Sequence, residues 1–286
     1  MKRLAGLVPV LAGFGGTVSV WCGPVGAPAT YARLEHETHY PASTMKLAVL
    51  AAAHRLADAG QLDLDAEVPV HNSFVSAAPG GGRFKMDPDY DSDPEVWRRL
   101  DGRVSLRWLA RRMIVRSSNL ATNLVLERVG CTAATDAWRA VGAGRSVVNR
   151  GIEDYAAKAA GLDNTVTAAD LAALLAAMET DRLASTDSCR EMRVVLLAQE
   201  KNDDLPSGLP PGTRIAHKNG WVDGVRHDAG IVYPPDVAPY LLVVCLTATR
   251  PDESMRHLMR RIAAASWAGR RGHRPGSDGE RPGVSR

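Results

Sequence analysis

The chain lacks the sequence features that mark several large classes of protein. None of its four cysteines (Cys22, Cys131, Cys189 and Cys245) stands in a C-x-x-C pair, so the sequence indicates neither a zinc site nor a disulfide framework. We expect these cysteines to be reduced and buried. No apolar run reaches the roughly 20 residues that a membrane-spanning helix needs. The formal net charge is only +3, and no basic stripe interleaved with aromatic residues predicts a nucleic-acid surface.

What the sequence does contain is typical of a globular protein. It has 286 residues, of which 45% are hydrophobic and 23% charged, enough for one large domain or two lobes. The N-terminal stretch "MKRLAGLVPVLAGFGG" imitates a signal peptide, because Lys2 and Arg3 precede an apolar run. No small-x-small cleavage site follows it. We therefore expect a cytoplasmic protein, with secretion as the alternative.

Strand patterns lie at both ends of the chain, and helix patterns lie between them. The strand patterns cover 17–23, 30–35, 214–218, 227–233 and 240–247. The helix patterns cover 43–60, 105–114, 118–129, 132–141, 167–179, 186–200 and 251–268. Residues 61–103 are mostly loop. The sequence thus predicts an α/β (α+β) fold, in which residues 1–60 and 201–268 form an antiparallel sheet flanked by N- and C-terminal helices. Residues 61–200 would form an inserted all-α lobe, and residues 269–286 a disordered tail.

A serine and a lysine stand three residues apart where the helix from residue 43 begins. In "YPASTMKLAVL" these are Ser43 and Lys46. Residues three apart share a helix face, so the lysine amine can reach the serine hydroxyl, a weak nucleophile that needs a base. Burial and neighbouring cations would lower the pKa of the amine. Such a pair is expected by chance about once in a chain of this size. The alternative is therefore a helix cap beside a solvated lysine.

Two further stretches carry residues that such a serine would need. "VRSSNLATNL" places Ser117 and Asn119 at a helix start, and "AHKNGWVDG" places Lys218, Asn219 and Gly220 at the end of a strand before a turn. Taken alone, the first is explained by helix N-caps and the second by a solvated lysine in a hairpin. Their combination with the serine–lysine pair is harder to explain by chance.

Taken together, S-T-M-K (43–46), S-S-N (117–119) and K-N-G (218–220) resemble, in order, the motifs of the serine penicillin-recognising family. The resemblance is greatest to class A β-lactamases and related serine hydrolases, and it covers about residues 4–268. It implies the β-lactamase/transpeptidase-like fold and a serine hydrolase without cofactor or metal. The implied partner is a small-molecule acyl substrate (a β-lactam, ester or amide). The enzyme would be a monomer, and neither nucleic acid nor a membrane would be a partner.

The resemblance also implies a role for each catalytic residue. Ser43 would be the nucleophile and Lys46 its base, and Ser117 would relay a proton to the leaving amine between Lys46 and Lys218. The N–H groups of Ser43 and Trp221 would form the oxyanion hole.

Substrate binding would involve the remaining motif residues. Asn119 would hold substrate amide groups, and Lys218 and Asn219 of the K-N-G motif, which Gly220 completes, would anchor a substrate carboxylate.

The sequence departs from the family pattern at the residues that would remove the acyl group. The E-x-x-L-N loop of class A β-lactamases is missing, and Glu153 is the candidate for the carboxylate that activates water, with its neighbour Asp154 as the alternative. Both could equally be surface carboxylates. His217 and His227 are expected to be packing residues rather than bases.

Substrate recognition is affected by three further departures. Ser118 stands for the aspartate of S-D-N, Asn219 stands for a hydroxyl residue, and Trp221 is bulky where a small residue is usual. β-Lactam amide hydrolysis remains the leading activity. The alternatives are an intracellular esterase or amidase, a D,D-peptidase or a biosynthetic transacylase, and, thirdly, a binding module that has lost catalysis.

Overall fold

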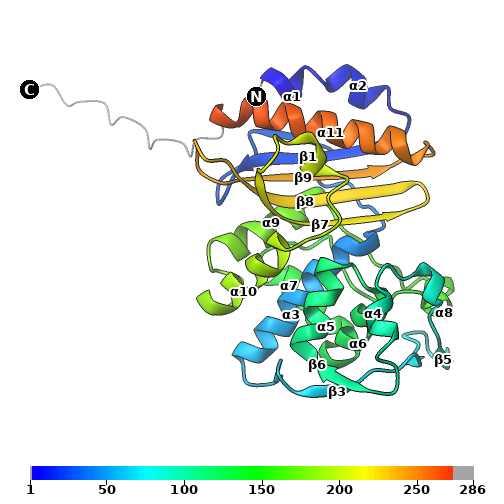
Figure 1. The fold of residues 1–286 in the computed structure, drawn as a ribbon. Coiled ribbons are helices and arrows are strands. Elements are labelled where there is room, and N and C mark those ends of the chain that lie inside the picture. Colours follow the sequence, from blue (N-terminus) through cyan, green and yellow to red (C-terminus); the bar gives the residue numbers. More distant parts are fainter. Residues whose placement is uncertain (1, 273–286) are drawn as a thin grey trace, which may run out of the picture.

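A five-stranded antiparallel sheet forms the centre of one lobe (Figure 1). The computed structural model describes residues 2–272. The strand order is β2-β1-β9-β8-β7, with β1 at Thr17–Pro24, β2 at Tyr31–Arg33, β7 at Arg214–Val222, β8 at Val225–Tyr233 and β9 at Tyr240–Thr247. The two ends of the chain meet where β1 pairs with β9, from Thr17 opposite Thr247 to Pro24 opposite Tyr240. The predicted antiparallel sheet built from both chain ends is confirmed.

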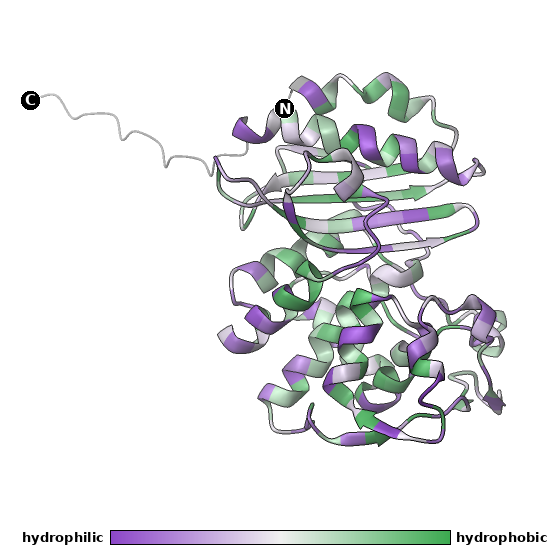
Figure 2. Cartoon of the chain, viewed as in Figure 1, coloured by the Kyte–Doolittle hydropathy of each residue, from purple (hydrophilic) through white to green (hydrophobic). Residues whose placement is uncertain are grey.

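One face of the sheet is covered by helices from the two chain ends (Figure 1). These are α1 (Lys2–Ala5), α2 (Val8–Ala12) and α11 (Asp252–Gly269). Leu4 and Leu11 are buried in the same apolar cluster as Leu258 and Ile262 of α11. Figure 2 shows hydrophilic and hydrophobic residues alternating along α11, as expected for a helix with one face on a core. The N-terminal residues are therefore part of this lobe's core.

The other face of the sheet meets a helical lobe. Its helices are α3 (Lys46–Asp58), α4 (Pro94–Trp97), α5 (Leu106–Val115), α6 (Asn119–Val129), α7 (Cys131–Arg139), α8 (Tyr155–Ala159), α9 (Ala168–Glu179) and α10 (Thr186–Leu197). Two small antiparallel sheets pair β3 (Glu67–Pro69) with β6 (Arg103–Ser105) and β4 (Phe74–Val75) with β5 (Arg83–Phe84). Every residue of α3 from 46 to 54 is buried, so this helix is the central element of the lobe.

Helix caps explain why most predicted helices begin where they do. The hydroxyl oxygens of Ser105, Ser118 and Thr167 accept hydrogen bonds from backbone N–H groups three residues later, at 3.2, 3.1 and 3.1 Å. The structure differs from the prediction at Ser43. This residue lies in a 3-10 turn, η1 (Ala42–Met45), and the α-helix begins only at Lys46. Helix α8 was not predicted.

Two other boundaries differ from the prediction. Strand β7 continues to Val222, so the K-N-G motif lies inside the strand and not at its end, because β8 pairs with it along its whole length. Helix α11 runs to Gly269, and residues 270–272 form a further 3-10 turn held by the ion pair of Arg270 with Asp236. Order therefore extends into the predicted tail, whose remaining residues, 273–286, lie outside the described part.

The four cysteines form no disulfide bond within residues 2–272. Cys22, Cys189 and Cys245 are buried as expected, whereas Cys131 is partly exposed. Within residues 2–272, no helix is both long and apolar enough to cross a membrane.

Candidate active site

A cavity of about 920 Å³ lies where the two lobes meet. Five of the residues selected from the sequence line it: Ser43, Ser117, Asn119, Glu153 and Trp221. They come from the η1 turn, the α5–α6 junction, the loop before α8 and strand β7. Segments far apart along the chain thus converge on one cavity.

Gly220 brings strand β7 directly onto the backbone of Ser43. A Cβ atom built at Gly220 would lie 2.5 Å from the Ser43 nitrogen and 3.0 Å from the Thr44 nitrogen. Real side chains do not tolerate such distances, so only glycine fits here. The residue after Gly220 is Trp221, and its position next to this contact is where the second oxyanion-hole donor is expected.

Lys46 is buried and held by the α5–α6 junction. Its Nζ atom donates hydrogen bonds to the backbone oxygen of Ser117 at 2.7 Å and to the Asn119 Oδ1 atom at 2.9 Å. Longer contacts reach the Ser117 Oγ atom and the Ser118 backbone oxygen, both at 3.3 Å. Among the described residues, its partners all belong to 117–119 and not to Ser43. The alternative of a solvated Lys46 is wrong, because the side chain is inaccessible to solvent.

Two buried lysines repel one another at the site. Burial, followed by the charge of Lys218, holds the pKa of Lys46 well below its usual value, while Asp91 acts in the opposite direction. Burial also lowers the pKa of Lys218 to about 7, against the opposing effects of Asp228 and Asp204. Lys218 is therefore not the solvated hairpin lysine of the alternative interpretation. A buried lysine with a lowered pKa can be neutral near pH 7 and accept a proton.

Strained backbone is concentrated at the same place. Six non-glycine residues of the described chain have positive φ angles, and three of them belong to the site: Ala42, which directly precedes Ser43, at 45°, Ser117 at 59° and Glu153 at 62°. Each such residue costs about 1–2 kcal/mol, which the surrounding packing must offset. Strain of this kind clusters at functional sites.

Comparison with known proteins shows to which family this chain belongs. The family described as "Beta-lactamase enzyme family" matches residues 1–269. The chain belongs to this family. A β-lactamase from Streptomyces fradiae is 30% identical over 243 residues, which make up 84% of this chain and 76% of that protein.

Solved structures of the β-lactamase family share the fold. PBP-A has a TM-score of 0.80 at 20% identity, with 95% of this chain and 97% of that chain covered. The class A β-lactamase of the last common ancestor of Gram-negative bacteria has a TM-score of 0.79 at 22% identity, covering 94% of this chain and 99% of that one. A mutant of PBP-A has been solved as an acyl-enzyme complex with penicillin G. The class A β-lactamase-like fold predicted from the motifs is confirmed.

The two neighbouring carboxylates, Glu153 and Asp154, have different environments. Glu153 lines the cavity, its Oε2 atom accepts the N–H of Asp87 at 2.9 Å, and its Oε1 atom is buried without a hydrogen-bond partner among the described residues. Burial is the main cause that raises its pKa. Asp154 instead caps α8 and accepts hydrogen bonds from Ser76 and Ala77. Of the two, only Glu153 is available to the cavity.

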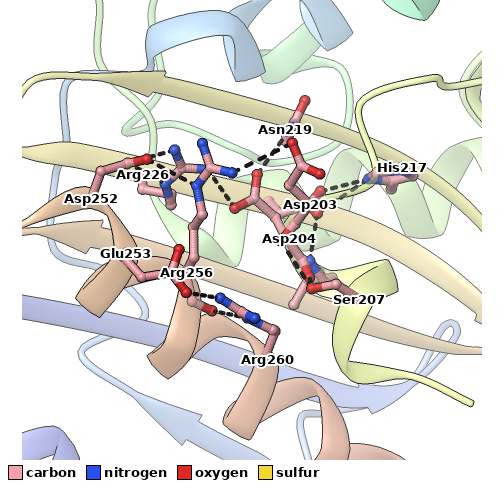
Figure 3. Close-up of polar contacts among 12 residues, drawn as sticks. Asp203, Asp204, Ser207, His217, Asn219, Arg226, Asp252, Glu253, Arg256 and Arg260 are labelled. Atoms are coloured by element: carbon pink, nitrogen blue, oxygen red, sulfur yellow. Dashed lines mark hydrogen bonds and ion pairs between the residues drawn. The ribbon is translucent and has the colours of Figure 1, made fainter.

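The side chain of Asn219 takes part in a buried polar network (Figure 3). Its Nδ2 atom donates to an oxygen of Asp204 at 2.8 Å, and the other oxygen of Asp204 accepts from Arg226 at 2.7 Å. Arg226 also pairs with Asp252 of α11 and lies 5.9 Å from the centre of the Trp221 ring. The Asn219 side chain is thus engaged with Asp204, is only 2% exposed and is not among the residues that line the cavity.

Both histidines near the site are structural, as expected. His227 is buried, donates from Nε2 to the Tyr40 backbone oxygen at 2.8 Å and accepts the Leu246 N–H at Nδ1. Burial lowers its pKa to about 4, so it stays neutral. His217 lies between Asp228 and Asn202, on the Asn219 side of β7.

The sequence-based selection missed the segment 90–93. Tyr90 and Ser92 line the cavity, and Asp91 contacts the S-S-N motif directly. The segment lies in "DPDYDSDPE", which reads as a turn-rich loop. The signal in the sequence that could have pointed to this segment was its row of alternating aspartates. Carboxylates spaced this closely need hydrogen-bond or ionic partners where they are not fully solvated.

Proposed function

We propose that this protein is a serine hydrolase that opens β-lactam amides through a covalent acyl-Ser43 intermediate. The observation that carries the proposal is the close contact of Gly220 with the Ser43 nitrogen, beside a cluster in which Lys46 binds Ser117 and Asn119. This contact supports an oxyanion hole between η1 and β7, and the cluster supplies a buried amine.

Acylation follows from these groups. The Ser43 Oγ atom attacks the substrate carbonyl carbon, and its proton passes to the neutral amine of Lys46. The Ser43 and Trp221 N–H groups stabilise the negative charge that develops on the carbonyl oxygen. As the C–N bond breaks, the leaving nitrogen takes a proton from the Ser117 hydroxyl, which Lys46 replenishes across the 3.3 Å contact.

Removal of the acyl group is assigned to Glu153. Glu153 lines the cavity and its Oε1 atom has no hydrogen-bond partner among the described residues, so its carboxylate can take a proton from a water molecule that attacks the acyl carbon. Burial raises the pKa of Glu153, which makes the carboxylate a stronger base than an exposed one. The remaining carboxyl oxygen is kept in place by the Asp87 N–H.

A specific observation favours a second candidate, an ester or amide hydrolase or transacylase acting on substrates without a carboxylate. Arg226 is buried between Asp204 and Asp252, and Asn219 is bound to Asp204. These contacts neutralise the polar groups behind β7, so neither Asn219 nor Arg226 is available to a substrate carboxylate. The same chemistry on an uncharged ester needs no such anchor.

Intact-mass measurement after incubation with penicillin G or a p-nitrophenyl ester tests the proposal. We expect wild-type protein to gain the mass of the acyl group, and Ser43→Ala to gain none. Ser254→Ala, at an exposed serine of α11 outside the cavity, should still be labelled. Labelling of Ser43→Ala at the wild-type level would refute the nucleophile. A mass gain with the ester but not with penicillin G would establish the second candidate.

A further inference from the structure

The carboxylate of Asp91 lies at the centre of the S-S-N motif. Its Oδ2 atom accepts hydrogen bonds from the Ser118 hydroxyl at 3.1 Å, the Leu120 N–H at 2.8 Å and the Trp97 indole N–H at 3.0 Å. Three donors thus converge on one oxygen of Asp91. Asp91 comes from a segment about 27 residues away in sequence from Ser118.

The neighbours of Asp91 bind the same junction. Each of the residues 90, 92 and 93 makes a polar contact with the stretch between the end of α5 and the start of α6. The contacts are Asn119 Nδ2 to the Tyr90 oxygen at 2.9 Å, Ser92 Oγ to the Arg116 oxygen at 2.6 Å, and Arg112 Nε to Asp93 at 2.6 Å. Four consecutive residues thus support one turn, which we call the 90–93 support.

The supported turn is the one that holds the catalytic amine. Lys46 binds the backbone or side-chain oxygens of Ser117, Ser118 and Asn119. Ser117 has a φ of 59°, so this turn does not hold its shape through backbone preference alone. A fixed hydrogen bond from outside is the kind of constraint that keeps such a turn in place.

We propose that Asp91 is a positioning residue for acyl transfer, which supplies from a separate segment the carboxylate that this chain lacks at Ser118. This inference rests on the proposed function and deepens it. Asp91 holds Ser118 and the first turn of α6, and through them the three oxygens around Lys46. Its negative charge also reaches Lys46 and opposes the two effects that lower the pKa of the amine.

The first test compares Asp91→Asn with Asp89→Asn, an exposed aspartate of the same 3-10 turn. We expect Asp91→Asn to lower the second-order rate constant of Ser43 acylation about 10- to 100-fold, the usual cost of losing charge-assisted hydrogen bonds. The acidic limb of its pH profile should move to lower pH, because Lys46 loses a nearby negative charge. Asp89→Asn should behave like wild type. An unchanged rate and profile in Asp91→Asn would overturn the inference.

An exchange of the two residues separates positioning from general destabilisation. Ser118→Asp alone places two carboxylates against each other and should lose acylation. The double variant Asp91→Asn/Ser118→Asp restores one carboxylate and one polar partner, and it should recover most of the wild-type rate. A double variant no faster than Asp91→Asn would contradict the inference.

A measurement without substrate separates this inference from the proposed function. The pKa of Lys46 can be followed by NMR of protein labelled at lysine Cε, with the signal identified by its loss in Lys46→Arg. We expect Asp91→Asn to lower this pKa further and the double variant to raise it again. If wild-type protein is not acylated while these shifts occur, the proposed function fails, whereas the positioning of Lys46 by Asp91 stands. If acylation occurs but the shifts do not, the inference fails alone.

Discussion

Replacement of Gly220 with alanine tests how closely β7 must approach the nucleophile. The added Cβ atom would lie 2.5 Å from the Ser43 nitrogen, 3.0 Å from the Thr44 nitrogen and 3.1 Å from the Ser43 Cα atom. Because non-bonded heavy atoms rest at about 3.5–4.0 Å, β7 and the η1 turn must separate by about 1 Å. All three atoms belong to backbone, so no side chain can rotate away to relieve the contact.

The expected result follows from this displacement. A shift of about 1 Å in the catalytic groups can lower a rate by about 10², so acylation of Ser43 should fall at least that far. Overpacking should also lower the free energy of unfolding by about 1–3 kcal/mol. Rapid-quench mass spectrometry with penicillin G or the ester measures the rate, and thermal unfolding measures the stability.

Gly144→Ala provides the matched control. A Cβ atom at Gly144 meets no atom within 4 Å, so this variant should keep the wild-type rate and stability. If Gly220→Ala acylates at the wild-type rate, β7 does not contribute to the oxyanion hole as proposed. A loss of rate in Gly144→Ala would show that the assay responds to any added methyl group.

Three further predictions concern the polar groups around the cavity. Glu153→Gln should accumulate the acyl-enzyme in intact-mass spectra, because loss of a general base slows deacylation about 10²–10⁴-fold; unchanged turnover would exclude the role. Asp204→Ala should lower the free energy of unfolding by about 3–5 kcal/mol, because it leaves Arg226 buried without one of its two carboxylate partners. Alanine at the exposed neighbour Asp203 should be tolerated. Equal melting temperatures for the two variants would contradict this prediction. Lys218 is a cation only below its pKa of about 7, so the KM of a carboxylate-bearing substrate should rise as the pH rises through 7, while the KM of an uncharged ester should stay constant.

Local patterns in the sequence were sufficient for the elements and for most of the site. The continuous apolar run "YLLVVCLT" predicted β9 with the observed bounds, 240–247, and the caps at Ser105 and Thr167 located α5 and α9. These features depend on neighbours within about four residues, which is why sequence alone reveals them. The three motifs could be recognised for the same reason, since each is contained in a short stretch.

The sequence did not reveal on which side of β7 each motif residue lies. The family resemblance implied that Asn219 anchors a substrate carboxylate, and the strand pattern was expected to end at residue 218. Pairing with β8 extends β7 to Val222, and the two-residue period then places Lys218 and Gly220 toward the helical lobe and Asn219 toward Asp204. A strand boundary is set by the partner strand, so it is not contained in the strand's own residues.

The sequence by itself determined which chemical groups are present: a serine, two lysines and a glycine in recognisable stretches, on a chain whose ends form strands. Only the tertiary structure decided which oxygens surround the amine of Lys46, and that Asp91 supports them from another segment. It also decided that Glu153, and not Asp154, faces the cavity. The physical reason is that hydrogen bonds and charges act through distance in space, and residues far apart in the chain are brought within that distance only by packing of the two lobes.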